Sequence, residues 1–450
     1  MDEDERTPHP LAAARIMCGL NRVEFAKAVC DAARRHGLRS GVDKARVRKW
    51  EVNGVRPDAV SQTYIAEVLG VPASDVDPAA WPAWLPRVDK GVVPLGPANI
   101  VPALREALRT MDRRTLLSAI SGSALVLLAG SWADTEPAAL AAVPHRPEAA
   151  VGEDAVAVLE ETSARLNALA TAQRQHIAPL YDAHLTHITD LIDEQRFSRP
   201  LEIRLHKLAA SLSQSVAWIR FDHGQHGDAA RYWIAGLHNA HASHDRDMGA
   251  ALLSDLAYQA SWQDDPATAA GILTKALTRT THPAASSLLH LRLARAQAAL
   301  GERRATLRSL HTAERLLSKP AGDTPAWCSW MSDADLAVDS GRCLLDLGDT
   351  TQAHSLIAQG QTLLPTSRDK TRGIFLAYRA QGHLTRREPE AAAADALQAL
   401  RLAERIGAPR CVQLVRDLVP AFTSYQTADG VPELLHAVPK RAWKRSCRSR

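Results

Sequence analysis

Four cations in one short stretch are the residues of this chain best placed to bind a charged ligand. The stretch from Asp43 to Pro57 reads DKARVRKWEVNGVRP. As a helix that begins near Asp43, it places Val47 and Trp50 three positions apart on one face, where both can be buried. The rest of the helix surface then carries the cations Lys44, Arg46, Arg48 and Lys49. Such a helix can place guanidinium and ammonium groups on the phosphates and base edges of double-stranded DNA.

Sequence signals predict where this helix and its neighbour begin and end. Asn53 and Gly54 supply a stop, because a residue with positive φ commonly follows a helix. Upstream, Asn21 followed three positions later by Glu24 forms a capping-box pattern that predicts the start of another helix. The sequence therefore predicts short helices joined by turns around the cationic stretch.

This spacing resembles a known family. The pattern V-x-x-W-E-x-x-G-x-x-P from Val47, preceded by LNRVEFA at Leu20 to Ala26, resembles the helix-turn-helix of XRE-like (phage-repressor/Cro) transcriptional regulators. The resemblance covers roughly residues 8 to 77. It implies that Lys44, Arg46 and Lys49 face base edges and that Arg56 approaches the DNA backbone or the minor groove.

The sequence departs from that family between Cys30 and Val42. These residues, CDAARRHGLRSGV, lengthen the second helix or enlarge the turn before the cationic helix. Arg39 in this insertion, with Arg34 and Arg35, can add phosphate contacts.

Composition and charge bound the rest of the chain. The 450 residues are 46% hydrophobic, 23% charged and 5% aromatic, which indicates more than one globular domain and favours helices over sheets. The net charge is only +4, yet eleven Lys and Arg face four Asp and Glu between Arg15 and Arg56. Six more cations lie in the tail after Val438. Basic charge is therefore concentrated at both ends of the chain.

The spacing of the cysteines and the N-terminal residues indicate the cellular compartment of the protein. The six cysteines have no C-x-x-C pair, so they are expected to be free thiols in a reducing compartment and not a disulfide framework or a zinc site. The start MDEDERTPHP has no secretory signal pattern. Together these features predict a cytoplasmic protein.

Residues 78–152 are predicted to be a linker that contains an apolar helix at 115–132. Trp81 to Pro97 is too rich in proline for a regular helix or a central strand. From Asp112 to Ala133, two arginines precede a mostly apolar run, which resembles a twin-arginine export signal or a marginal membrane span. A buried or partner-facing helix is favoured, because serines and glycines dilute the run, and a membrane partner is disfavoured.

Residues 153–438 predict a stack of helical hairpins. Turn signals recur at intervals of about 37, 37, 47 and 40 residues, at Gly227-Asp228, Asp264-Asp265-Pro266, Gly301-Glu302, Gly348-Asp349 and Glu388-Pro389. This pattern resembles divergent tetratricopeptide (TPR-like) repeats. Hairpins that cannot bury their apolar faces singly must stack, so the expected fold class is all-α, with a solenoid whose concave groove holds a peptide, a protein segment or a small-molecule effector.

Other candidate residues have two interpretations each. Histidines spaced by three can ligate a metal, but ordinary polar or interface histidines are favoured: His184/His187, His223/His226 and His238/His241/His244. Five tryptophans can line a groove, although helical core is favoured: Trp218, Trp233, Trp262, Trp327 and Trp330. The basic tail at 439–450 can grip DNA or serve as a solubilising end.

The sequence thus supports one main hypothesis and two alternatives. Because no phosphate-binding glycine loop or nucleophile motif is present, neither an enzymatic activity nor a cofactor is predicted. The main hypothesis is a DNA-binding transcriptional regulator, expected to be a homodimer; the resemblance points to actinobacterial regulators of antibiotic production or development. The alternatives are a TPR-like interaction scaffold without specific DNA binding and a membrane-anchored sensor.

Overall fold

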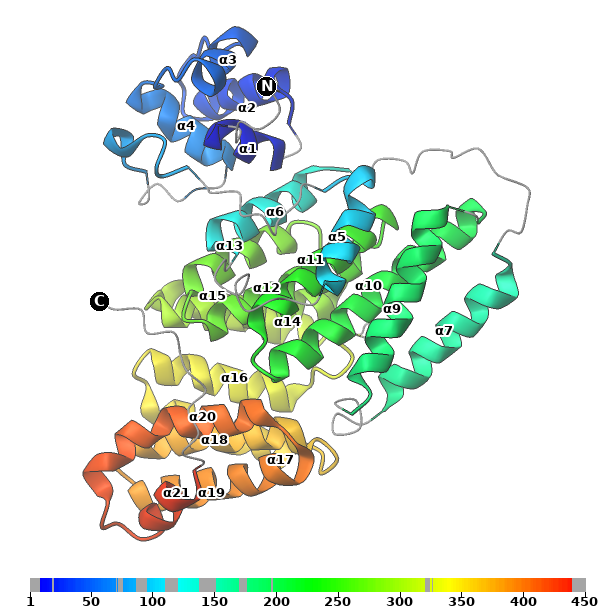
Figure 1. The fold of residues 1–450 in the computed structure, drawn as a ribbon. Coiled ribbons are helices and arrows are strands. Elements are labelled where there is room, and N and C mark those ends of the chain that lie inside the picture. The colour runs from blue at the N-terminus through cyan, green and yellow to red at the C-terminus, as the bar shows by residue number, and fades with distance from the viewer. Residues whose placement is uncertain are drawn as a thin grey trace.

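The computed structural model describes residues 9–17, 20–69, 71, 76–85, 95–109, 120–136, 151–169, 176–195, 197–319, 324–325 and 327–438. Within these ranges every regular element is an α-helix or a 3-10 helix. Figure 1 shows a small helical domain at one end of a longer stack of paired helices. The all-α class with a TPR-like helical stack, predicted from the sequence, is confirmed. The basic tail and residues 110–119 lie outside the described residues.

Four short helices form the N-terminal domain: α1 (Pro10–Met17), α2 (Arg22–Arg35), α3 (Lys44–Val52) and α4 (Ala59–Leu69). The predicted capping box starts α2: the Asn21 side chain accepts a hydrogen bond from the backbone N–H of Glu24, and the Glu24 carboxylate accepts one from the Asn21 N–H. The helices enclose one small core, formed by residues that include Phe25, Val29 and Ile65.

The segment from Cys30 to Val42 supplies both the end of α2 and the whole loop before α3. The Cys30 thiol lies 3.3 Å from the carbonyl oxygens of Ser40 and Val42. These contacts hold the loop against the end of α2. Because Val42 is itself buried, the loop returns the chain to the core just before α3 begins.

Residues 78–152 contain packed structure as well as connections. The described elements are η3 (Pro78–Ala80), η4 (Pro97–Asn99), α5 (Ile100–Leu108) and α6 (Gly122–Asp134). Trp84 folds back on the N-terminal domain, where its indole N–H donates to Gln62 Oε1 at 2.9 Å. The apolar helix expected at 115–132 is seen from Gly122 onward. No helix in the described part of the chain is both long and apolar enough to cross a bilayer.

α6 lies between the N-terminal domain and the repeat stack (Figure 1). Leu127 of α6 belongs to the same buried cluster as the core of the N-terminal domain. Trp132, on another part of α6, is fully buried in the main core of the stack. Arg246 holds this end of the helix, because its guanidinium donates to the Trp132 carbonyl at 2.7 Å and lies 5.3 Å from the centroid of the Trp132 ring. α6 is therefore a structural joint.

The repeat stack follows as antiparallel helix pairs (Figure 1). Its helices are α7 (Glu153–Ala168), α9 (Ala178–Glu194), α10 (Arg199–Asp222), α11 (His226–Ala242), α12 (Arg246–Trp262), α13 (Pro266–Leu277), α14 (Pro283–Ala299), α15 (Arg303–Leu317), α16 (Asp333–Asp346), α17 (Thr350–Leu363), α18 (Asp369–Thr385), α19 (Pro389–Ile406), α20 (Pro409–Phe422), η6 (Thr423–Tyr425) and α21 (Val431–Ala437). The five turn signals read from the sequence fall at the hairpin connections from α10–α11 to α18–α19. Three of these connections contain glycines with positive φ, Gly224, Gly301 and Gly348, where a side chain would be strained.

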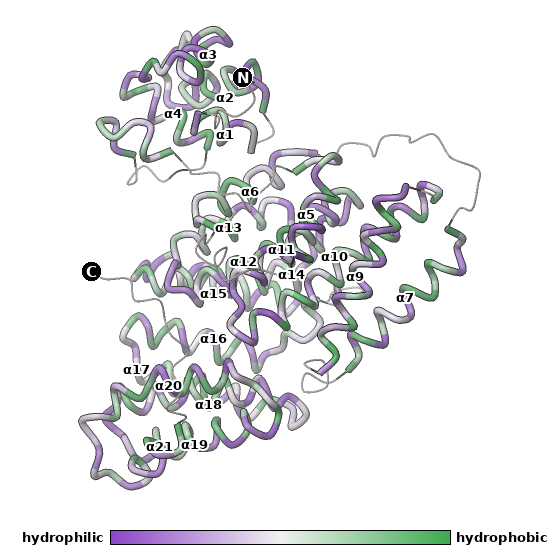
Figure 2. The backbone as a smooth tube through the Cα atoms, viewed as in Figure 1, coloured by the Kyte–Doolittle hydropathy of each residue, from purple (hydrophilic) through white to green (hydrophobic). Residues whose placement is uncertain are grey.

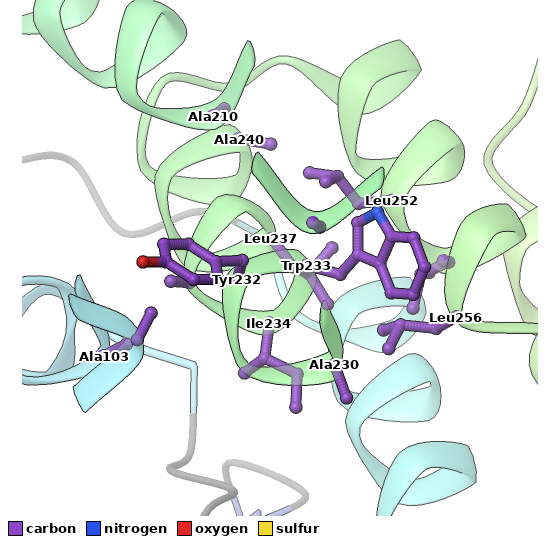
Figure 3. Packing of buried hydrophobic residues seen from close by; sticks show 14 of the residues in the cluster. Ala103, Ala210, Ala230, Tyr232, Trp233, Ile234, Leu237, Ala240, Leu252 and Leu256 are labelled. Carbon is purple, nitrogen blue, oxygen red and sulfur yellow. The ribbon is translucent and has the colours of Figure 1, made fainter. Parts of the chain in front are cut away.

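Small residues allow the paired helices to approach closely. The alanines that follow three of the predicted turns, Ala269, Ala353 and Ala393, are all buried. Trp233 of α11 fills the space between helices and packs near Leu252 and Leu256 of α12 (Figure 3). Hydrophobic and hydrophilic stretches alternate along the helices of the stack (Figure 2), as expected when each helix buries only part of its surface.

Candidate functional site

α3 presents the predicted cations on its outer surface. Val47 and Trp50 are buried in the core, with exposed fractions of 0% and 2%. The four cations Lys44, Arg46, Arg48 and Lys49 are all exposed. The Asp43 carboxylate caps the helix by accepting from the backbone N–H of Arg46 at 2.8 Å. α3 lies on the side of the N-terminal domain that faces away from the repeat stack (Figure 1), so the stack does not cover this surface.

A buried ion cluster fixes the orientation of α3. The Glu51 carboxylate is 6% exposed and accepts from Arg15 Nε at 2.5 Å and from Arg22 Nε at 2.6 Å. Arg15, itself buried, also donates to the carbonyl of Leu20 at 2.6 Å. α1, α2 and α3 therefore meet at one carboxylate. Local sequence patterns give no sign of this role for Glu51, because its partners lie 29 and 36 positions away.

The two candidate arginines outside α3 lie in loops. Arg39 is exposed in the loop between α2 and α3. Arg56 follows α3, and its guanidinium donates to the carbonyl of Pro78, which ties it to the domain. Arg35 is paired with Glu67 at 2.8 Å, and this hydrogen bond lowers the pKa of the Glu67 carboxyl. Arg35, the last residue of α2, is therefore less available for a ligand than the cations of α3 or Arg39.

His184, one of the candidate histidines, and His206 make ordinary polar contacts. His184 Nε2 lies 2.9 Å from Ser163 Oγ, and His206 Nδ1 lies 2.8 Å from Asn239 Oδ1. Burial, with a smaller effect of the nearby Arg246 charge, lowers the pKa of His241 to about 4. Among the described residues, no three His, Cys, Asp or Glu side chains are grouped so that they could hold a metal ion.

The tryptophans mostly contribute to packing. Trp233 is fully buried, while Trp218, Trp262 and Trp327 are half-buried against the main core. Of the five candidate tryptophans, only Trp330 is exposed, at 42%. Trp218, Phe221, Tyr258 and Trp262 also surround one cation, because the Arg410 guanidinium lies between 5.5 and 5.9 Å from each of their ring centroids.

Ion pairs that are buried or half-buried cross-link the even-numbered helices of the stack. These helices, α10 to α20, contact one another in succession. Arg292 of α14 pairs with Asp255 of α12 at 2.9 Å, and Arg295 of α14 pairs with Asp339 of α16 at 2.6 Å. These two pairs therefore join α12 to α14 and α14 to α16 along this row of helices.

Asp222 joins the beginning of this row to its end. It lies at the last position of α10, is buried, and pairs with Lys370 of α18 across 148 positions of sequence. Arg410 of α20 lies 3.7 Å from the same carboxylate. Burial opposes ionisation of Asp222, but the two cations outweigh it and lower its pKa. The row of helices is therefore curved enough for its ends to meet.

Comparisons with known proteins identify two partial similarities. A family model described as the SP15 N-terminal domain matches residues 11–73, which span α1 to α4. No curated protein matches the chain. The solved structure titled "Crystal structure of APC/C hetero-tetramer Cut9-Hcn1" is similar at 13% sequence identity, with a TM-score of 0.32, over 88% of this chain and 75% of that one.

The described helices and their contacts define the class of protein. The chain is a TPR-like helical-repeat protein with a small helical domain before the repeats. The matching family model is not the XRE-like family that the sequence resembles, so that membership stays a prediction. A solved structure this distant carries no argument about function.

Proposed function

We propose that this protein is a non-enzymatic interaction scaffold whose repeat stack binds protein partners. The observation that carries the proposal is the row of even-numbered helices, cross-linked by ion pairs and closed by Asp222. Such a row holds the exposed helix surfaces in fixed relative positions before a partner arrives, which lowers the entropy cost of binding. Helical repeats commonly present extended binding surfaces of this kind.

Cross-linking of the full-length protein in its own cells tests this function. We expect the repeat stack to be cross-linked to one particular partner protein in every repetition of the experiment. When this partner and the full-length protein are purified and mixed, analytical ultracentrifugation should show a complex of defined mass. Recovery of no reproducible partner, or of one that forms no complex when purified, would contradict the proposal.

DNA binding in transcriptional regulation is the second candidate, and α3 is the specific observation that favours it. Its cations are exposed and its orientation is fixed by Glu51. In this hypothesis a homodimer in the cytoplasm places two α3 helices in successive major grooves, and an effector on the repeat stack changes their spacing.

Selection of duplexes from a random pool, followed by binding assays over a range of salt concentrations, tests the second candidate. Changing Arg46 and Lys49 together to alanine should reduce affinity by at least about tenfold and flatten the logarithmic salt dependence by about 2. The matched control changes Arg304 and Arg308 of α15, two other exposed arginines, to alanine. Equal affinities for the two double variants would remove α3 as the DNA-binding element but leave the scaffold function standing.

A further inference from the structure

Two adjoining open clefts lie between α17 and α19, with α18 beneath them. Their volumes are about 340 and 520 Å³, within the size range of ligand sites. Arg372 and Gln398 line both clefts, so the two form one continuous surface. Residues of α18 also line this cleft, but Asp222, Lys370 and Arg410 do not, so the cleft is separate from the contact that closes the row.

Four arginines line the cleft, and two of them can exchange partners. Arg401 pairs with Glu433 at 3.1 Å while 70% of its side chain is exposed, and Arg405 pairs with Asp369 at 2.7 Å while 62% is exposed. Exposed pairs of this kind contribute little to stability. An incoming carboxylate can therefore replace the present partner of either arginine at little cost.

The other two arginines are held in place. Arg379 donates to the buried Asp395 carboxylate through two nitrogens, at 2.5 and 2.6 Å. Arg372 Nη2 donates to the carbonyl oxygens of Leu364 and Pro365 at 3.0 and 3.3 Å, and no carboxylate pairs with it among the described residues. Arg372 is therefore a positioned guanidinium with donors left for a ligand at the junction of the two clefts.

An apolar floor completes the surface, and a buried amide lies beside it. Gln361 accepts from Arg379 through its Oε1, while its buried Nε2 has no hydrogen-bond partner in the described part of the chain. The mostly buried side chains of Leu376 and Leu402 line the clefts beneath these polar groups. The site thus combines guanidinium groups, which can donate two hydrogen bonds to one carboxylate, with a surface for an apolar side chain.

We infer that this cleft binds an acidic peptide segment of a protein partner. Asp or Glu side chains of the segment pair with Arg372, Arg401 and Arg405, and an apolar side chain covers Leu376 or Leu402. The inference depends on the proposed scaffold function and assigns a site and a chemical class to its partner. A nucleic acid fits less well, because the residues that line the clefts include no aromatic ring on which a base could stack.

The probe is a phage-displayed library of random dodecapeptides, selected on the full-length protein. We expect selected peptides to be enriched in Asp and Glu next to one large apolar residue. Changing Arg401 and Arg405 together to glutamate should reduce the affinity of the protein for a fluorescein-labelled selected peptide by at least about tenfold. The control changes Arg304 and Arg308 of α15 to glutamate; these exposed arginines have the same spacing of four and lie outside the clefts, so binding should be unchanged.

Other outcomes overturn the inference in distinguishable ways. If the selected peptides are not enriched in acidic residues, or if both variants reduce peptide affinity equally, the cleft is not the binding site for an acidic peptide. The proposed scaffold function would be unaffected by either result. Displacement of the peptide by single-stranded DNA of ten nucleotides, but not by excess glutamate-rich peptide, would assign the cleft to nucleic acid. If the selection yields no peptide and the cross-linking experiment yields no partner, both proposals are contradicted.

Discussion

The N-terminal domain and the repeat stack both bury a carboxylate between two cations, but they use it differently. Glu51 joins three helices that already surround one small core. Asp222 joins helices from opposite ends of a long row. In the small domain, the ion cluster and the core therefore stabilise the same unit. In the stack, each repeat is stabilised by its contacts with the neighbouring helix pairs. The Asp222 ion cluster adds a separate contact between the two ends of the row.

This difference predicts different modes of failure. A small core contributes little surplus stability, so loss of one buried charge can unfold the whole domain. A repeat array loses stability locally, because each repeat contacts mainly its neighbours. Four experiments, from the largest expected effect to the smallest, test this comparison.

Changing Glu51 to alanine should have the largest effect, a loss of about 3–5 kcal/mol in the N-terminal domain. The reason is that Arg15 would stay buried without its partner. Hydrogen exchange should show α1 to α4 unprotected while the repeat stack stays protected. As a control, Glu67 pairs with Arg35 on the surface, and its change to alanine should cost less than about 1 kcal/mol.

Changing Asp222 to alanine should cost about 3 kcal/mol, because Lys370 and Arg410 would lose their buried counter-charge. The comparison predicts that α18 and α20 lose hydrogen-exchange protection while α1 to α4 are unchanged, and that small-angle scattering reports a longer particle. The exposed Asp193, changed in the same way, should alter neither measurement. Uniform loss of protection along the stack would show that closure is not a separate contribution.

Acid should weaken the stack through His241. Its pKa is lowered to about 4 in the folded protein, so the unfolded chain binds the proton more tightly. The contribution of neutral His241 to the free energy of unfolding is therefore fully present above pH 6.5 and is lost as the pH falls toward 4. The free energy of unfolding should decrease by roughly 2 kcal/mol between pH 7 and 4.5. Urea unfolding at several pH values should show this slope, and changing His241 to glutamine should reduce it. His206 and His226, whose pKa values burial also lowers, should leave a residual slope.

The joint between the two regions should be the least costly to disturb. A Cβ added at Gly249 would lie 2.4 Å from Trp132 Nε1, so Gly249→Ala must displace that ring and shift α6. We expect a loss of about 1–2 kcal/mol in thermal unfolding, with faster hydrogen exchange in α6. Gly382 on α18 has no atom within 4 Å of such a Cβ, so Gly382→Ala should be neutral or slightly stabilising. A loss of the same size at both glycines would count against the steric reason.

The sequence alone determined the local elements. Val47 and Trp50 lie three apart and are buried, the Asn21 capping box starts α2, and the turn signals lie at hairpin connections. Each of these features follows from helix periodicity, capping or turn chemistry, which act over a few residues. The exposure of the α3 cations follows from the same periodicity, whereas their binding to DNA stays a prediction.

Only the tertiary structure decided which distant residues meet. It placed Glu51 between Arg15 and Arg22, brought Asp222 to Lys370 and set α6 as the joint between two cores. It also formed the arginine-lined cleft between α17 and α19. Local patterns show which face of a helix is apolar but not which other helix covers it. That choice depends on how all the apolar faces of the chain are buried together.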